Sequence, residues 1–106
     1  MKKLLLAVIV SLSTVTTAAL AEIKVGIILG FTGPIESLTP AMRDGARMAF
    51  DEASNSGNLL GGESITILEA DSTCVDSAAA TSAAEGLVAN GVVAIMGADC
   101  SGVTGA

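Results

Sequence analysis

Polar and reactive side chains follow the apolar runs of this sequence at the points where those runs end. Asp71 and Cys74 follow one run, and Asp99, Cys100 and Ser101 follow another. Carboxylates, thiols and a hydroxyl can bind a ligand, form a disulfide or act in catalysis. Because both groups follow the ends of predicted strands, we expect them at the edge of the sheet where the carboxyl ends of the strands meet. In α/β proteins, small ligands bind at that edge.

Ser101 has the clearest binding chemistry of these residues. The apolar run at 92–96 indicates a buried strand, which breaks at Gly97 before a helix that should begin near Ser101. A hydroxyl and the free backbone N–H groups of a first helical turn can hold a carboxylate. A serine that acts only as the N-cap of the helix explains the pattern equally well.

Cys74 and Cys100 are the only cysteines of the sequence. In an oxidising compartment, an even pair at one sheet edge predicts a disulfide. A redox pair and a metal site are the alternatives. The sequence has no C-x-x-C motif and no histidine, and two thiols make a poor structural zinc site.

The sequence offers little for catalysis or cofactor binding. Without histidine, no Ser–His or Cys–His pair can form in this segment. Gly26, Gly30 and Gly33 do not have the G-x-G-x-x-G spacing of a dinucleotide site. We therefore predict no catalytic residue, no cofactor and no metal.

The elements that must position these groups alternate between strands and helices. The β-branched apolar run at 23–29 predicts a strand covered on both faces, and Gly26 within it indicates the close approach of a helix. Further strands are predicted at 64–70 and 92–96. The order β-α-β-α-β predicts an α/β fold with a parallel, doubly wound, three-layer sheet.

Two amphipathic helices are predicted between the strands. The first has Thr39 as its N-cap and Gly57 at its C-terminal end, with Arg47 at pairing distance from Asp51. Its apolar stripe comprises Met42, Ala46, Ala49, Phe50 and Ala53. The second helix begins after the capping residue Asp76. Its stripe comprises Ala80, Ala83, Ala84, Leu87 and Val88.

Residues 1–21 have the pattern of a cleavable signal peptide. Two lysines precede an apolar run at 4–10, and 19–21 is a small-x-small cleavage site. The apolar run is much shorter than the roughly 20 residues that span a bilayer. Because Glu22 rather than cysteine follows the cleavage site, no lipid attachment is expected. This pattern predicts export to the periplasm.

Without Lys2 and Lys3, three basic residues remain against eleven acidic ones. Nucleic-acid binding needs clustered lysine and arginine to neutralise phosphates, so we expect no nucleic-acid partner. An acidic chain is also repelled by anionic membrane surfaces, which favours a freely diffusing protein.

The ordered pattern of these segments resembles the start of the type I periplasmic solute-binding proteins. It comprises the leader, IKVGIILGFTGP, AMRDGARMAFDEAS, a Gly-Gly turn before a strand that ends in Asp, and LVANGVVAIMGADCSGVTGA. Within that family it is similar to the leucine/isoleucine/valine-binding subunits of ABC importers. The resemblance implies two α/β lobes that close on a ligand. Residues 22–106 match only the first part of the N-terminal lobe, without the hinge and second lobe.

The resemblance also implies roles for individual residues. Ser101 matches a serine that binds the α-carboxylate of an amino acid, and Cys74 and Cys100 match loops that a disulfide joins. Leu38, Asp99 and Cys100 are further candidates for ligand contact. The family's leucine-type binders have an aromatic residue at the position of Leu38 and an apolar one at that of Asp99. Another amino acid, an amide or a small organic acid is therefore as compatible as a branched-chain ligand.

These expectations combine into one functional prediction. The sequence predicts an exported protein that captures an amino acid or similar solute and delivers it to the membrane subunits of an ABC permease. We expect a monomer when complete, and no measurable ligand affinity for these 106 residues alone. A sensory ligand-binding domain of the same fold is the alternative, and a periplasmic thiol enzyme is a third possibility.

Overall fold

The computed structural model describes residues 22–106, so the predicted signal peptide at 1–21 lies outside the described part. The strands of its one sheet are β1 (Ile23–Leu29), β2 (Ile65–Asp71) and β3 (Ala94–Met96). Both strand pairs are parallel, and the strand order is β2-β1-β3. Leu29 pairs with Asp71, and β3 ends beside Ile27. The three strands therefore end together at what we call the carboxyl edge.

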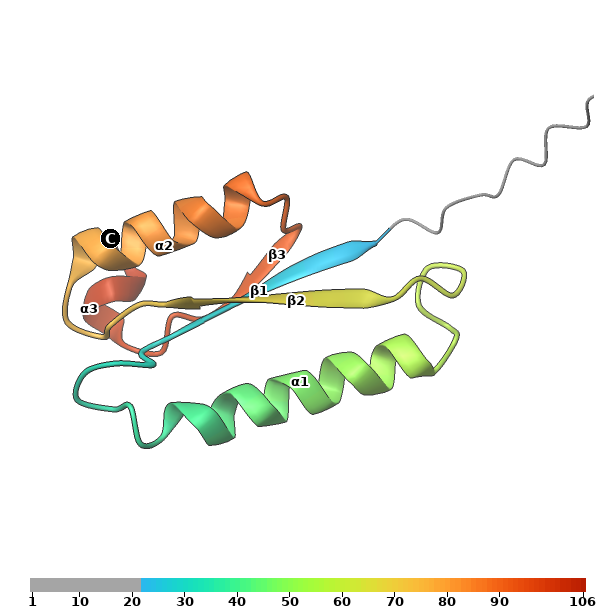
Figure 1. The fold of residues 1–106 in the computed structure, drawn as a ribbon, viewed down its shortest axis with the longest axis horizontal. Helices are drawn as coiled ribbons and strands as arrows, with labels where there is room; N and C mark the ends of the chain where they lie inside the picture. The colour runs from blue at the N-terminus through green and yellow to red at the C-terminus, as the bar shows by residue number, and fades with distance from the viewer. Residues whose placement is uncertain (1–21) are drawn as a thin grey trace, which may run out of the picture.

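The helices of the described part are α1 (Thr39–Asn55), α2 (Ser77–Ala89) and α3 (Ser101–Thr104). Helix α1 covers one face of the sheet and α2 covers the other, with α3 packed beside α2 (Figure 1). This arrangement confirms the predicted three-layer α/β fold, in which helices cover both faces of a parallel, doubly wound sheet. Within the described residues, no helix has the length and hydropathy that are needed to cross a bilayer.

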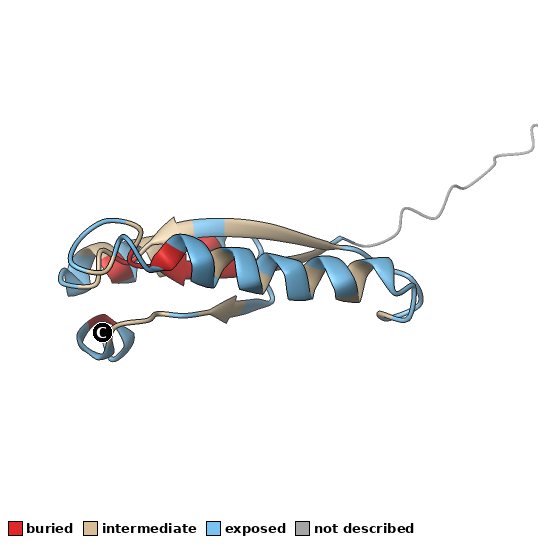
Figure 2. Cartoon of the chain, turned by 90° about the horizontal axis from the view of Figure 1, so that it is seen from below, coloured by how far each residue is buried: buried red, intermediate tan, exposed pale blue. Residues whose placement is uncertain are grey.

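The core is centred on β1, the middle strand of the sheet. The buried apolar residues of this strand are Val25, Ile27, Ile28 and Leu29. A Cβ atom on Gly26 would lie 2.9 Å from Leu87 Cδ1, so the missing side chain lets α2 approach the sheet. This contact confirms the helix approach predicted at Gly26. Helix α1, by contrast with the central strand, is mostly exposed, and Thr39 is its one buried residue (Figure 2).

The start of α1 differs from the prediction. Its N-cap is Leu38, and Thr39 is the first helical residue. The Thr39 side chain is fully buried, and its hydroxyl donates to the Glu36 carbonyl oxygen at 3.2 Å. The preceding turn, closed by a hydrogen bond from Leu38 N–H to the Ile35 carbonyl, directs this hydroxyl away from the first-turn N–H groups.

Four predictions about the helix faces were wrong. Arg47 pairs with Glu69 of β2 rather than with Asp51, with 2.7 Å between Nη2 and Oε1, because α1 lies over β2. Met42, Ala49 and Val88 belong to the predicted apolar stripes, but all three are exposed, Met42 by 44% and Val88 by 63%. Helical spacing identifies a face, but the packing of the neighbouring strands decides which of its residues are covered.

The predicted ends of the helices agree better with the structure than the predicted faces do. Asp76 caps α2, and its carboxylate accepts two first-turn N–H groups at 2.9 and 3.0 Å. Gly57 follows α1 with a φ of +69°, the left-handed conformation expected of a glycine there. Strand β3 begins two residues later than predicted, because the Val92 N–H donates to the Leu87 carbonyl and continues the end of α2.

Candidate functional site

A disulfide between Cys74 and Cys100 joins the loops that follow β2 and β3 at the carboxyl edge. The S–S distance is 2.02 Å and the Cα atoms are 5.2 Å apart, so the predicted pairing is confirmed. The bridge passes beside the end of β1, where a Cβ on Gly30 would lie 3.1 Å from the Cys74 Cβ. Glycine at position 30 therefore makes room for the disulfide.

Asp99 joins the β3 loop to the ends of the other two strands. Its Oδ1 and Oδ2 accept from the backbone N–H of Gly30 at 3.1 and 3.0 Å. The hydroxyl of Ser72, which is fully buried just after β2, lies 3.4 Å from Oδ1. The Ser72 N–H in turn donates to the Leu29 carbonyl. One carboxylate thus contacts residues that follow both β1 and β2.

Asp71, the last residue of β2, also holds the loop that follows β1. Its carboxylate accepts from the Thr32 hydroxyl at 2.6 Å, the Thr32 N–H at 3.3 Å and the Thr73 N–H at 2.8 Å. Burial alone would raise the pKa of Asp71, but these hydrogen bonds favour the ionised carboxylate. Their combined effect lowers its pKa below the usual 3.8.

This lowered pKa predicts an acid-sensitive contribution of Asp71 to stability. The carboxyl binds protons less readily in the folded than in the unfolded chain, so its stabilisation is fully present above its ordinary pKa. The stabilisation is lost as the pH falls through the lowered pKa. Urea unfolding at a series of pH values from neutral down to about 3 should show Asp71→Asn losing less stability on acidification than the unaltered chain. Parallel pH profiles for the two chains would contradict this.

Ser101 lies at the same edge as the first residue of α3. The N-cap is Cys100, so Ser101 is not the N-cap that one interpretation of its spacing predicted. Ser101 is exposed, and its hydroxyl and N–H have no acceptor among residues 22–106. The N–H of Gly102 likewise has none there. Three hydrogen-bond donors therefore lie together, next to the disulfide.

The other sequence candidates occupy different positions at the carboxyl edge. Leu38 precedes α1, and its side chain is 61% exposed. Asp99 and Cys100 are both half-buried and use their functional groups in the contacts already described. The residues that sequence reasoning missed are Gly30 and Ser72. Only their places within two residues of the ends of predicted strands could have pointed to them.

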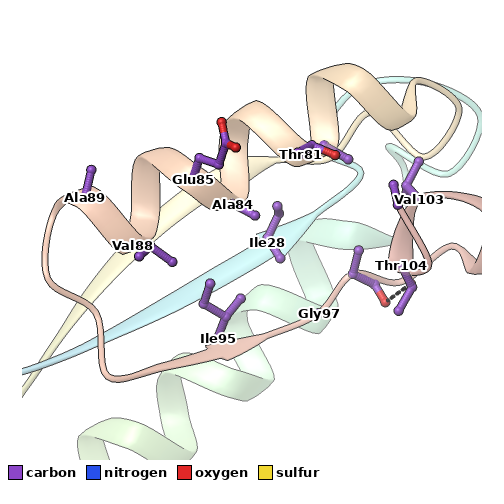
Figure 3. Close-up of a pocket in the computed structure, with 13 residues that line it drawn as sticks. Ile28, Thr81, Ala84, Glu85, Val88, Ala89, Ile95, Gly97, Val103 and Thr104 are labelled. Atoms are coloured by element: carbon purple, nitrogen blue, oxygen red, sulfur yellow. Dashed lines mark hydrogen bonds between the residues drawn. The ribbon is translucent and has the colours of Figure 1, made fainter.

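A cavity of about 530 Å³ lies between α2 and the β1 and β3 strands, and residues on both sides of the Asp99–Ser101 segment contribute to its lining. Figure 3 shows Ile28, Val88 and Ile95 around this space, with Val103 and Thr104 of α3 at one end. Glu85 is the one charged residue in its lining, which is otherwise mostly apolar. None of the sequence candidates lines it. Within 22–106, no cluster of three potential metal ligands is present either.

Residues 22–106 match the profile of a protein family described as periplasmic binding protein. The chain belongs to the periplasmic binding protein family. Among curated proteins, it is similar to the Leu/Ile/Val-binding protein BraC3 of Rhizobium johnstonii, with 31% identity over 101 residues. That similarity covers 95% of this chain but 27% of the relative, so the chain spans about a quarter of the relative's length.

Membership of the periplasmic binding protein family supports a solute-binding role rather than an enzymatic one. It also agrees with a periplasmic location. The carboxyl edge of this periplasmic binding protein has the features that suit such a role. It presents exposed donors at Ser101 on loops that a disulfide and two carboxylates hold together.

Proposed function

We propose that this chain is the first part of the N-terminal lobe of an exported solute-binding protein that serves an ABC importer. The leader at 1–21 would direct export, and 22–106 would contribute one wall of the ligand site. The observation that carries this proposal is the group of donors at Ser101, on the carboxyl edge of a parallel sheet, that have no acceptor among residues 22–106.

We propose an amino acid as the ligand, with its α-carboxylate on the Ser101 hydroxyl and the neighbouring N–H groups. Hydrogen bonds to an ionised group are the stronger kind, and a carboxylate can accept several donors at once. The exposed Leu38 supports an apolar ligand side chain, since it offers an apolar surface at the same edge. The similarity to a Leu/Ile/Val-binding protein also supports a branched-chain ligand.

The proposed mechanism is a shift between open and closed arrangements of two lobes. A ligand that touches both lobes binds the closed form more tightly and so increases its population. The permease subunits would recognise that closed form. Ser101 contributes by holding the ligand on the first lobe before closure.

Ser101→Ala should weaken amino-acid binding by the complete protein about tenfold, because one hydrogen bond to a charged group is lost. Titration calorimetry with leucine, isoleucine and valine, extended to other amino acids, measures this change. Ser82→Ala is the matched control, since Ser82 is exposed on α2 and should leave the affinity unchanged. Equal affinities for Ser101→Ala and the unaltered protein would remove Ser101 from the site.

A further inference from the structure

Asp99 has an unusual position for an acidic residue, two residues before the serine that we propose as a carboxylate contact. A charge that faced the ligand there would repel its carboxylate. The structure instead directs both oxygens of Asp99 to the Gly30 N–H. The Ser72 hydroxyl lies 3.4 Å from one of them. The carboxylate is therefore engaged with the protein's own donors.

The partners of Asp99 are fixed parts of the fold. The Gly30 N–H directly follows the buried end of β1, and Ser72 is fully buried with its own N–H on the Leu29 carbonyl. A hydrogen bond between an ionised group and such fixed donors is stronger and better oriented than a neutral one. Asp99 thus ties the loop of β3 to the central strand.

Ser101 follows two consecutive residues that are each held to another part of the carboxyl edge. Asp99 is held to the end of β1 through Gly30, and Cys100 is bonded to Cys74 after β2. The backbone that enters α3 therefore has little freedom to turn. Both restraints act on the backbone directly before the Ser101 N–H and hydroxyl.

We propose that Asp99 is a positioning residue of the ligand site, which orients Ser101 through the Gly30 N–H and does not itself contact the ligand. This inference rests on the proposed function, because it concerns the affinity for the ligand of Ser101. It also explains how an acidic residue can lie beside a carboxylate site.

A double-mutant cycle in the complete protein tests this role. Asp99→Ala should weaken leucine binding about tenfold, and the variant that combines it with Ser101→Ala should bind no more weakly than Ser101→Ala alone. Asp99→Asn, which keeps one acceptor oxygen for Gly30, should lie between Asp99→Ala and the unaltered protein. The matched control is Asp71→Asn, whose partners Thr32 and Thr73 lie outside the Ser101 loop, so its effect should add to that of Ser101→Ala.

The outcomes separate this inference from the proposed function. If Ser101→Ala weakens binding but the Asp99 effect adds to it, Asp99 acts independently and the positioning role is overturned. An unchanged affinity in Asp99→Ala overturns it as well. If Ser101→Ala has no effect, the proposed site fails, and this inference fails with it.

A measurement without ligand keeps the test decisive if Asp99→Ala does not fold. In Asp99→Asn, the backbone amide resonances of Gly30 and Ser101 should shift, whereas that of Thr32, held by Asp71, should not. Unchanged Gly30 and Ser101 resonances would show that Asp99 does not connect them, and would overturn the inference.

Discussion

Gly97→Ala is expected to lower the free energy of unfolding by about 2 to 5 kcal/mol. Gly97 has a φ of +121°, which a residue with a side chain rarely adopts. A Cβ there would overlap the Ile28 carbonyl oxygen and lie 2.9 Å from the Ile28 Cγ2. Because Ile28 is buried in the central strand, it has no room to withdraw. Urea unfolding followed by circular dichroism measures the loss.

Two other glycines separate the steric cost from the backbone cost. Gly57 also has a positive φ, but nothing lies within 4 Å of its Cβ position, so Gly57→Ala should cost only about 1 kcal/mol. Gly45 is in the middle of α1 with the same open space, and Gly45→Ala should be neutral or stabilising by up to about 1 kcal/mol. A loss in Gly97→Ala no larger than in Gly57→Ala would contradict the contact with Ile28.

Removal of the disulfide is the second large effect that we expect. The Cys74–Cys100 bridge joins positions that are 26 apart in sequence, so it restricts the unfolded chain. The paired variant Cys74→Ser, Cys100→Ser should lose about 3 to 4 kcal/mol. Urea unfolding with and without a reductant measures this loss.

The reductant also provides the control for this prediction. It should destabilise the unaltered chain by about as much as the double substitution does, and it should not affect the substituted chain. Thiol titration in denaturant should find no reactive cysteine before reduction. Two reactive thiols at that stage would contradict the bridge and favour a redox pair.

The strands and helices could be predicted because their patterns are local. The continuous β-branched run of β1 and the Asp76 cap each carry their information within a few residues. The errors arose where a tertiary contact or the geometry of a turn decided the outcome. Arg47 pairs with Glu69 of β2, 22 positions away in sequence. The Thr39 hydroxyl donates to the Glu36 carbonyl, only three positions back, in a turn that the propensity of Thr39 does not predict.

In the candidate site, too, one feature could be predicted from the sequence and another could not. The meeting of Cys74 and Cys100 followed from the parallel order of the strands and the even count of cysteines. The hydrogen bonding of Asp99 could not be predicted in this way. Its carboxylate accepts from a backbone N–H, and every residue except proline offers such a donor. No side-chain pattern in the sequence therefore distinguishes a carboxylate that faces a ligand from one that faces Gly30.

The disulfide has a mechanical consequence because of the strand order. Strands β2 and β3 do not touch each other, since β1 lies between them. The Cys74–Cys100 bond connects the loops at the carboxyl ends of β2 and β3 directly. Each of these two strands is also hydrogen-bonded to β1, so all three strands are linked to one another. A force applied at Ser101 is thus shared by all three strands, and β3, the shortest of them, does not have to bear it alone.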